Sequence, residues 1–592
     1  MVESPIMTPP HGPSASKTWL RAIETASRLT DDKARTFAAL LDKLGETYGD
    51  APALLSDIEQ FSFQQLAARS RRYTRWALSL GLTKGDCVAL LMPSRPEYFA
   101  VWVGISRMGA IVSLINTNLR DAALAHCIGV VKPSHLIVEG SLAAALDSAA
   151  EHLNTSPAIW RADQFDLSGM SDEPFSEDDF PDIGQDDTAL HIYTSGTTGL
   201  PKAARISHGR ILSWSGWFSG LLGAQPDDRL YDCLPMYHSV GGVTAIGAAL
   251  AGGASVVLRE RFSATSFWSD IVRWDCTLFQ YIGELCRYLL ASPETPDDRR
   301  HRLRLICGNG LNADVWTAFQ SRFAIPRVLE FYAATEGSFS LYNVEGRPGA
   351  VGRIPPFLAY RVAVALIRFD PETEQPVRNS DGRCTACAAG ETGEAIGRIS
   401  LSARAGPSAF EGYTDKAASE RKVLRGVFEP GDAWFRTGDL MHKDAAGYFY
   451  FEDRIGDTFR WKGENVSGQT IHDVVAQCPG VREAAIFGVK VPHAEGRAGM
   501  AAIVADADFD LTVLADLVIR HLPSFGRLHF VRRVRQLPLT ETFKLKKQQL
   551  AGDGFDIART SDPIYLLDSA DGLYRRLDPA LHSRLLRGEL RL

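Results

Sequence analysis

A glycine-rich stretch, residues 193–202, constrains the fold of this chain more than any other feature; its sequence is YTSGTTGLPK. It follows the apolar residues Leu190 and Ile192, which favour a strand. Glycines free the backbone so that N–H groups can point at an anion, while hydroxyls and a lysine add donors and charge. We expect this stretch to bind a polyphosphate through Thr194, Ser195, Gly196, Thr197, Thr198, Gly199 and Lys202.

Two other interpretations of this stretch, a Walker A loop and a surface linker, fit the residues less well than phosphate binding. A Walker A loop needs the pattern G-x-x-x-x-G-K-[ST], but here Gly199 is followed by Leu-Pro-Lys, so the spacing excludes it. A surface linker rich in Ser, Thr and Gly is the second alternative. The ending in Pro-Lys, directly after a strand that reads as buried, argues against a linker.

Length and charge limit the classes of protein to consider. A chain of 592 residues is too long for one hydrophobic core, and it predicts about three to five structural units. The net charge of -7 gives no overall attraction to nucleic acid, so any grip on phosphates must be local. Nine cysteines without a secretory signal favour reduced thiols and a cytosolic location. Cys384 and Cys387 have the spacing C-x-x-C, but no second pair lies nearby to complete a zinc site.

Apolar stretches at residues 99–116 and 240–258 were considered as membrane spans. The first is interrupted by Arg107 and the second by several glycines, so both predict buried helix-strand units instead. Peripheral contact with a bilayer stays open. Residues 1–17 are rich in Pro and Ser and predict a disordered tail that is neither a signal peptide nor a transit peptide.

Helical and strand-like patterns alternate over residues 18–160. Examples are a helix at 63–80, a strand at 87–91, a helix at 96–108 and a strand at 110–114. Such alternation predicts an α/β fold with a mostly parallel sheet that helices cover on both faces. An apolar stripe at helical spacing predicts a further core helix, with Trp214, Trp217, Phe218, Leu221 and Leu222 on its buried side.

Four further motifs follow the glycine-rich stretch. They are LPMYH at 234–238, CGNGL at 307–311, YAATEG at 332–337 and a long run at 433–466. Small residues at 308–310 would let a flat adenine ring approach the backbone. A carboxylate such as Glu336 would repel a polyphosphate without a cation, so this motif implies a bound metal. Asp439 is suited to accept hydrogen bonds from ribose hydroxyls, to which Arg454 can donate.

Structural alternatives exist for each of these motifs. Thr335 and Glu336 could cap a helix, and Asp439 and Arg454 could each form half of a surface salt bridge. Tyr237 and His238 could simply be packed aromatic residues. The motifs become specific through their order and spacing along the chain.

In this order the motifs resemble those of the acyl-adenylate-forming superfamily, which includes acyl-CoA synthetases, peptide-synthetase adenylation domains and luciferases. The resemblance covers roughly residues 18–565. The segment QYIGELCRYL at 280–289, Phe543 before Lys544, and the tail GFDI…DPIY at 554–565 resemble the branch of fatty acid transport proteins and very-long-chain acyl-CoA synthetases.

The resemblance implies roles for individual residues. The catalytic residues would be Lys544, Thr335, Glu336 and His238. Beyond the phosphate-binding stretch, ATP would contact Gly308, Asn309, Gly310, Tyr332, Thr335, Asp439 and Arg454. Glu336 and Thr198 would hold Mg²⁺, and Lys462, Gly463 and Glu464 would contact coenzyme A. The acyl group would lie beside Tyr237, His238, Gly241, Gly242 and Tyr281.

The same resemblance predicts a large N-terminal lobe of mostly parallel β-sheets covered by helices, with a small β-barrel-like part, and a small mobile α+β C-terminal domain. The expected boundaries are a tail at 1–17, an AMP-binding domain at 18–453, a hinge at 454–456 and the C-terminal domain at 457–592. Gly456 tolerates the backbone rotation that a hinge needs. Eight Lys and Arg between residues 520 and 547 form either a solvated face or a landing site for phosphates of CoA or anionic lipid.

The predicted activity is that of an ATP-dependent fatty acyl-CoA synthetase for long or very-long-chain acids, with ATP, Mg²⁺ and coenzyme A as cofactors and no nucleic acid partner. Alternatives are an acyl-AMP ligase that loads a carrier protein, an amino-acid adenylation module, and a membrane-associated fatty acid uptake protein with secondary ligase activity. No acidic residue is evident to receive an α-amine, which disfavours the adenylation module. The expected location is cytoplasmic, or peripheral to the inner face of the membrane, and a homodimer is one open oligomeric state.

Overall fold

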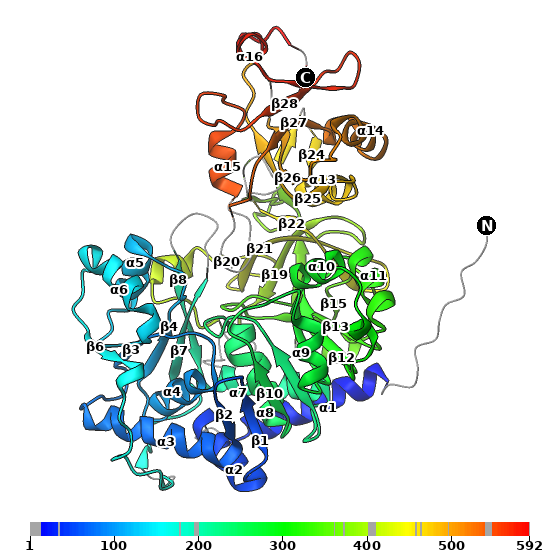
Figure 1. Ribbon diagram of the computed structural model, residues 1–592. Helices are drawn as coiled ribbons and strands as arrows, with labels where there is room; N and C mark the ends of the chain where they lie inside the picture. Colours follow the sequence, from blue (N-terminus) through cyan, green and yellow to red (C-terminus); the bar gives the residue numbers. More distant parts are fainter. Residues whose placement is uncertain are drawn as a thin grey trace. The chain divides into compact units, whose positions relative to one another are not determined.

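The computed structural model describes residues 14–592 except 33–35, 177–178, 195–200, 360–361, 371–372, 374, 401–409, 456–458, 462–463, 495, 539–546 and 591; at 460, 464, 465 and 548 it describes the backbone alone. The chain divides into two compact units (Figure 1). The first comprises Met1–Val364, Gly397–Arg425 and Gly431–Phe435, and the second comprises Ala365–Ile396, Gly426–Pro430 and Arg436–Leu592.

The first unit contains a six-stranded sheet that ends at the glycine-rich stretch. Its strands, in spatial order, are β6 (Ala158–Arg161), β5 (His135–Val138), β3 (Cys87–Leu91), β4 (Ile111–Leu114), β7 (Thr188–Thr194) and β8 (Lys202–Ser207). All neighbours are parallel except β7 and β8, which are antiparallel. The inner strands are runs of buried apolar residues, as expected for a parallel sheet covered on both faces.

A second sheet of the first unit carries the motifs at 234–238, 307–311 and 332–337, in its strands or directly after them. Its strands, in spatial order, are β15 (Gly352–Arg353), β14 (Ser340–Asn343), β13 (Val328–Ala333), β12 (Leu305–Asn309), β11 (Leu278–Ile282), β9 (Arg229–Asp232), β10 (Ser255–Leu258), β1 (Pro52–Leu55) and β2 (Gln60–Ser62). The strands from β13 to β1 run parallel. The loops after β11, β12 and β13 therefore leave the same edge of the sheet, where parallel sheets bind ligands.

Helices cover these sheets. Those of the first unit are α1 (Ala15–Thr30), α2 (Phe37–Tyr48), α3 (Phe63–Ser79), α4 (Pro96–Ser106), α5 (Asp121–Val131), α6 (Ala143–Ala149), α7 (His208–Leu222), α8 (Ile246–Ala251), α9 (Phe267–Arg273), α10 (Gly283–Ala291), α11 (Ala313–Phe323) and α12 (Lys416–Glu420). The short strand β20 (Val423–Arg425) also belongs to this unit. The predicted helix-strand alternation is confirmed, with element ends that differ from the predicted ones by a few residues.

The two apolar stretches and the end of the predicted N-terminal tail lie in helices and strands. Residues 99–116 form α4 and β4, and residues 240–258 form a π-helical turn (Val240–Ala245), α8 and β10. Within the described ranges, no helix combines the length and apolar character that crossing a bilayer requires. Residues 15–17, which were predicted to belong to a disordered tail, lie in α1, whose first turn donates a hydrogen bond to the Ser14 hydroxyl; residues 1–13 lie outside the described residues.

The second unit combines an antiparallel part with an open sheet. Strands β16 (Val364–Ile367), β19 (Gly393–Arg398), β21 (Ala433–Lys443) and β22 (Tyr448–Arg454) are neighbours in this order, and the hairpins are β17 (Phe369–Asp370) with β18 (Gln375–Pro376) and β23 (Phe459–Trp461) with β24 (Glu464–Val466). The five-stranded sheet comprises β25 (Val481–Val489), β26 (Ala498–Ala505), β27 (Leu528–Arg533), β28 (Ile564–Leu567) and β29 (Tyr574–Arg576).

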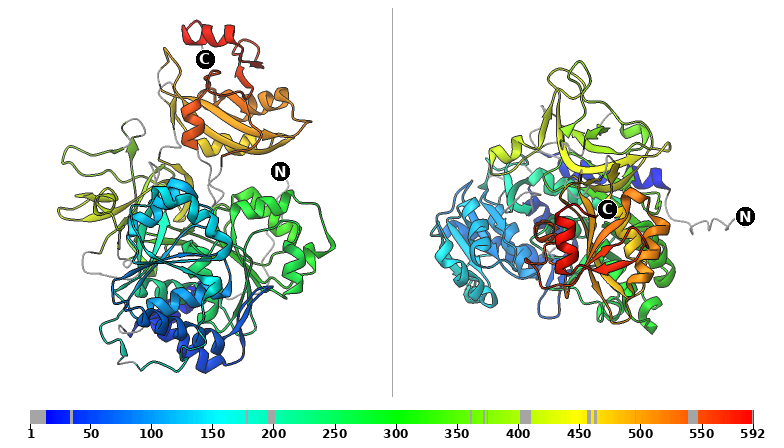
Figure 2. Two further views of the ribbon diagram at one scale, coloured as in Figure 1. Left: turned by 60° about the vertical axis from the view of Figure 1, so that its left-hand side comes forward. Right: turned by 90° about the horizontal axis from the view of Figure 1, so that it is seen from above.

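Helices α13 (Gly468–Val475), α14 (Leu511–His521), α15 (Lys547–Asp553) and α16 (Pro579–Leu586) accompany this sheet. Helices α13 and α15 contact β25, and α14 contacts β29, so the helices lie on the sheet (Figure 2). The unit has its own apolar core, which draws on residues from Phe459 to Leu585. A small C-terminal α+β part is thus present, while the predicted boundaries at 453 and 456 stay predictions.

Helix α7 links the fold to the site. It begins directly after β8, where the hydroxyl of Ser207 accepts a hydrogen bond from the backbone of Arg210. Its predicted apolar stripe is buried at Phe218, Leu221 and Leu222. Helix α7 also packs against α1, where an added Cβ on Gly220 would lie 2.5 Å from the Cα of Ala22. The two helix backbones can approach this closely at residue 220 because it has no side chain.

We predict that Gly220→Ala destabilises the first unit by about 1–3 kcal/mol, because the added methyl group overpacks the contact between α1 and α7. The measurement is the midpoint of thermal unfolding, followed by circular dichroism. The matched control is Gly169→Ala, an exposed site with nothing within 4 Å of the added Cβ. An unchanged midpoint in Gly220→Ala would show that the two helices can separate without cost.

Candidate active site

The two strands that flank the glycine-rich stretch place its first and last predicted residues side by side. Thr194 ends β7, Lys202 begins β8, and the two are partners in the antiparallel ladder. The Nζ atom of Lys202 lies 5.7 Å from the ring centroid of Tyr413. Backbone pairing of Tyr413 with Ala204 fixes that ring beside β8. One end of the predicted phosphate-binding stretch is therefore anchored to residue 413.

Tyr413 also holds the predicted metal-binding carboxylate. Its hydroxyl donates a hydrogen bond to Oε1 of Glu336 at 2.6 Å, and it interacts with the side chain of Thr194. Burial and the neighbouring carboxylate raise the pKa of Tyr413, so the phenol stays protonated and remains a donor. Tyr413 was not among the predicted site residues, because the segment Glu-Gly-Tyr at 411–413 has no local pattern that links it to residue 336.

Arg210, at the start of α7, fixes the backbone around the same carboxylate. Its Nη1 atom donates to the carbonyl oxygens of Thr335 at 3.0 Å and Gly337 at 3.1 Å, and its Nε atom lies 3.2 Å from Oε1 of Glu411. Arg210 is almost fully buried. No helix begins at Thr335, so the helix-cap interpretation of Thr335 and Glu336 is wrong. This turn is instead held rigid by a buried guanidinium group.

The hydroxyl of Thr335 lies 3.0 Å from that of Ser239. This contact connects the YAATEG turn to the segment that contains Tyr237 and His238. The rings of these two residues lie 4.6 Å apart, and the amide of Asn118 donates to the Tyr237 hydroxyl. Burial lowers the pKa of His238 to about 4, so its imidazole is neutral at pH 7. Its Nε2 atom is buried and has no hydrogen-bond partner in the described part of the chain.

Gly241 and Gly242 are both buried in the π-helical turn. An added Cβ on Gly242 would lie 1.7 Å from the carbonyl oxygen of Met236, and one on Gly241 would lie 2.8 Å from that of Pro235. Close backbone packing therefore explains why these two positions lack side chains.

The predicted adenine-binding turn follows β12. An added Cβ on Gly308 would lie 2.2 Å from the carbonyl oxygen of Tyr281, and Gly310 has a φ of +84°. The turn thus needs glycine at both positions. The Oδ1 atom of Asn309 is buried and without a hydrogen-bond partner among the described residues. Such an acceptor fits an amino group such as that of adenine. Tyr281 itself is fully buried against this turn, and its predicted contact with an acyl group stays a prediction.

In the second unit, the predicted ribose-binding residues face each other. Asp439 of β21 pairs with Arg454 of β22, and the Nε atom of Arg454 lies 3.3 Å from Oδ1 of Asp439. Asp439 is buried, and the side chain of Arg454 is 41% exposed. The pair can present a carboxylate and a guanidinium to one sugar, and it is also an ion pair in its own right. Both interpretations fit this geometry.

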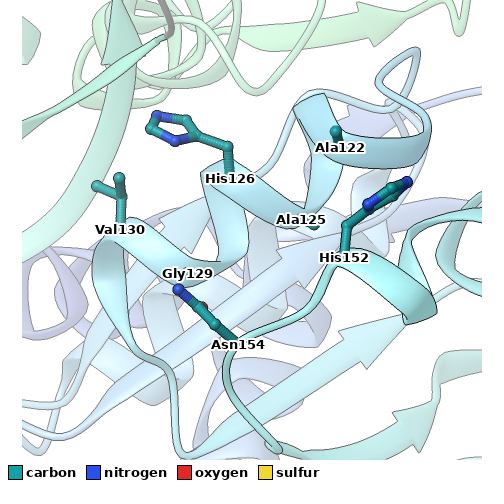
Figure 3. A pocket seen from close by; sticks show the side chains of 7 residues that line it. All are labelled: Ala122, Ala125, His126, Gly129, Val130, His152 and Asn154. Atoms are coloured by element: carbon teal, nitrogen blue, oxygen red, sulfur yellow. The ribbon is translucent and has the colours of Figure 1, made fainter.

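Several predicted site residues lie outside the described residues. These are Ser195, Gly196, Thr197, Thr198, Gly199, Gly456, Lys462, Gly463 and Lys544. Only the backbone of Glu464 is described, within β24. A cavity of about 380 Å³ lies on α5, beside His126 (Figure 3), and one of about 470 Å³ lies in the second unit. Neither is lined by a predicted site residue.

The carboxylate of Glu336 suits Mg²⁺ better than it suits a metal held by protein side chains alone. Mg²⁺ is usually held by one or two carboxylates together with substrate phosphates, so the single carboxylate of Glu336 fits it. Over the ranges that the structure describes, no cluster of three His, Cys, Asp or Glu side chains could hold a metal by itself. Neither Cys384 nor Cys387 forms a disulfide, and burial raises the pKa of Cys387 to about 11, which disfavours a zinc thiolate.

Comparison with known proteins agrees with these observations. The family profile of the AMP-binding enzymes matches residues 41–413, and that of the AMP-binding enzyme C-terminal domain matches residues 470–544. Long-chain fatty acid transport protein 1 of Mus musculus is 38% identical over 547 residues, which are 90% of this chain and 84% of the relative.

Two solved structures share the fold. One is ATP-bound MatB from Rhodopseudomonas palustris, with a TM-score of 0.72, 24% identity and coverage of 90% of this chain and 99% of that one. The other is the anthranilate CoA ligase AuaEII in complex with anthranoyl-AMP, with a TM-score of 0.75, 21% identity and coverage of 90% and 100%. The predicted α/β fold with a large sheet-containing lobe and a smaller C-terminal domain is confirmed. The chain therefore belongs to the AMP-binding enzyme family and, within it, to the group of the long-chain fatty acid transport proteins.

Proposed function

We propose that this protein is an ATP-dependent, AMP-forming acyl-CoA synthetase that acts on long or very-long-chain fatty acids. Family membership supports an AMP-forming acid-CoA ligase. The observation that carries the proposal is the junction at Tyr413, which joins Thr194, Lys202 and Glu336. A hydroxyl, a cation and a carboxylate at one point are suited to a polyphosphate with its divalent cation.

In the first half-reaction, an oxygen of the fatty carboxylate forms a bond to the α-phosphorus of ATP while the bond to pyrophosphate breaks. Negative charge grows on the oxygens around phosphorus, and cations that stabilise this charge lower the barrier. Lys202 and Lys544 would supply positive charge, and the hydroxyls of the glycine-rich stretch would donate hydrogen bonds. Bound at Glu336, Mg²⁺ would neutralise phosphate charge.

Tyr413 and Arg210 orient the groups that meet the phosphates. Because Tyr413 donates to Oε1 of Glu336, the carboxylate is fixed in one orientation, in which it would hold the cation. Arg210 holds the carbonyl groups on both sides of Glu336. His238 is uncharged at pH 7, so it would orient the fatty carboxylate by a hydrogen bond and would not pair with it as a cation.

In the second half-reaction, the thiol of coenzyme A loses its proton, its sulfur bonds to the acyl carbon, and AMP leaves with the bonding electrons. Gly463 would let the pantetheine arm pass close to the backbone. Lys544 would have to leave the phosphates before the thiol arrives, so we propose that the C-terminal domain moves between the two steps. Asp439 and Arg454 would hold the ribose in both.

A second candidate function is fatty acid uptake at a membrane, with ligation as a secondary activity. The similarity to long-chain fatty acid transport protein 1 of Mus musculus favours it. In that case we expect a peripheral location at the inner face of a membrane. Flotation with liposomes, compared with the rate of pyrophosphate exchange, separates the two functions. An acyl-AMP ligase would differ from both, because free coenzyme A would not discharge its adenylate.

The substrate class is tested by exchange of labelled pyrophosphate into ATP across saturated fatty acids from C8 to C26. We predict the highest kcat/KM at about C16 or longer, since each buried methylene contributes roughly 0.8 kcal/mol until the binding site is filled. Omitting the fatty acid is the control. A maximum at C8 or below would contradict the proposed chain length, and no exchange with any carboxylate would contradict the proposed reaction.

For Lys544→Ala we predict a loss of about 10²–10³-fold in adenylate formation, because the charge that stabilises the transition state is removed. Thioester formation from synthetic acyl-AMP and coenzyme A should change by no more than about threefold. The two rates are measured separately, and Lys546→Ala serves as the matched control for lost charge nearby. Equal losses in both half-reactions would argue against the role assigned to Lys544.

A further inference from the structure

Glu330 is a buried carboxyl group for which the proposed reaction has no role. It lies in β13, two residues before Tyr332, and it is 2% exposed. Its Oε1 atom accepts hydrogen bonds from the backbone N–H groups of Gly310 at 2.5 Å and Leu311 at 3.2 Å. Its Oε2 atom accepts one from the hydroxyl of Tyr281. These hydrogen bonds connect the Glu330 carboxyl group to the turn after β12 and to Tyr281 of β11.

The turn has little freedom on its other side. The carbonyl oxygen of Gly310 lies only 1.8 Å from where a Cβ on Gly283 would stand, so the turn packs directly on the start of α10. Gly308 packs in the same way against Tyr281. The turn is held by β11 and α10 through backbone contact, and by β13 through the Glu330 carboxyl group.

An apolar residue would fill this buried position without the cost of removing a carboxyl group from water. Glu330 offers instead an acceptor to two adjacent N–H groups of a turn that no regular ladder satisfies. Burial raises the pKa of Glu330 to about 8, so its carboxyl group is mostly uncharged at pH 7, and Oε1 still accepts both hydrogen bonds. The titratable groups that face it are Tyr281 of β11, Cys286 of α10 and Cys307 of β12, and burial raises the pKa of each.

We propose that Glu330 is a positioning residue for nucleotide recognition: it fixes Gly310 and Leu311 so that the turn presents Asn309 to the adenine ring in one orientation. This inference rests on the proposed function, since it assumes that ATP binds at this turn. It predicts that loss of the acceptor weakens the selection of adenine, and that it leaves the reacting groups at Glu336 in place.

The test compares two substitutions of similar size. Glu330→Gln keeps an oxygen acceptor for both N–H groups, whereas Glu330→Met leaves them unpaired. For Glu330→Met we expect KM for ATP to rise about tenfold, the effect of losing one or two hydrogen bonds. We expect kcat and KM for the fatty acid to stay within about threefold, and the preference for ATP over GTP to fall. Glu330→Gln should stay within about threefold of the wild type in every constant.

A general loss of structure would lower kcat for every substrate and would not alter the choice between ATP and GTP. If Glu330→Met does not fold, Tyr281→Phe gives the second measurement, because it removes the hydroxyl that hydrogen-bonds to Oε2 and keeps the ring. We expect it to raise KM for ATP about threefold. Wild-type protein without pyrophosphate exchange would contradict the proposed function. If the wild type is active, and Glu330→Met and Tyr281→Phe keep its KM for ATP and its preference for ATP over GTP, this inference is overturned.

The wild type and Glu330→Gln should also differ in how their stability depends on pH. Because the pKa of Glu330 is about 8 in the folded chain and 4.5 is its ordinary value, the folded state holds the proton over a wider pH range. The stability that Glu330 contributes is fully present below about pH 4.5 and falls as the pH rises toward 8. The unfolding midpoint of the wild type should therefore decrease relative to that of Glu330→Gln between pH 5 and 8. If the difference between the two unfolding midpoints is constant across this range, Glu330 titrates alike in the folded and unfolded chain, which would contradict its role as a buried carboxyl group.

Discussion

The hydrogen bond from Tyr413 to Glu336 joins segments that are 77 residues apart, and the proposed chemistry depends on it. A carboxylate placed beside a polyphosphate is repelled unless a cation lies between them. For such a group to be useful, it must stay in one orientation before the substrate arrives. The phenol of Tyr413 does this from one side, and the guanidinium of Arg210 fixes the backbone from the other. Because both groups are buried, water competes little for these hydrogen bonds.

The parallel sheet determines which motifs can meet. Strands β11, β12 and β13 are neighbours, so Tyr281, the turn after Asn309, and Tyr332 reach one edge although they are dispersed over more than fifty residues of sequence. Glu330 and Tyr281 lie under that turn and connect the three strands. Helix α7 adds the connection to the six-stranded sheet, because it follows β8 and carries Arg210. The site is therefore assembled from strand ends that only the sheet order brings together.

Sequence alone predicted those parts of the fold that depend on local pattern. The apolar runs at 87–91 and 240–258 gave β3, α8 and β10, since length and glycine content distinguish buried strands from membrane helices. The residues Tyr413, Arg210 and Glu330 could not be predicted in this way, because their roles depend on hydrogen bonds to partners that are 77, 201 and 19 residues away, respectively. At Gly241 and Gly242 the resemblance predicts contact with an acyl group, and the structure adds a separate reason for glycine, the close approach of the backbone at residues 235 and 236.

The central claim is that the glycine-rich stretch, the Glu336 turn and Asp439 serve one nucleotide. A crystal structure with Mg²⁺ and a non-hydrolysable ATP analogue tests it most directly. The account predicts triphosphate oxygens within hydrogen-bonding distance of residues 194–202, adenine against Gly308–Gly310 beside Asn309, and the ribose hydroxyls on Asp439. A nucleotide bound elsewhere, with its triphosphate away from residues 194–202 and its ribose away from Asp439, would contradict it.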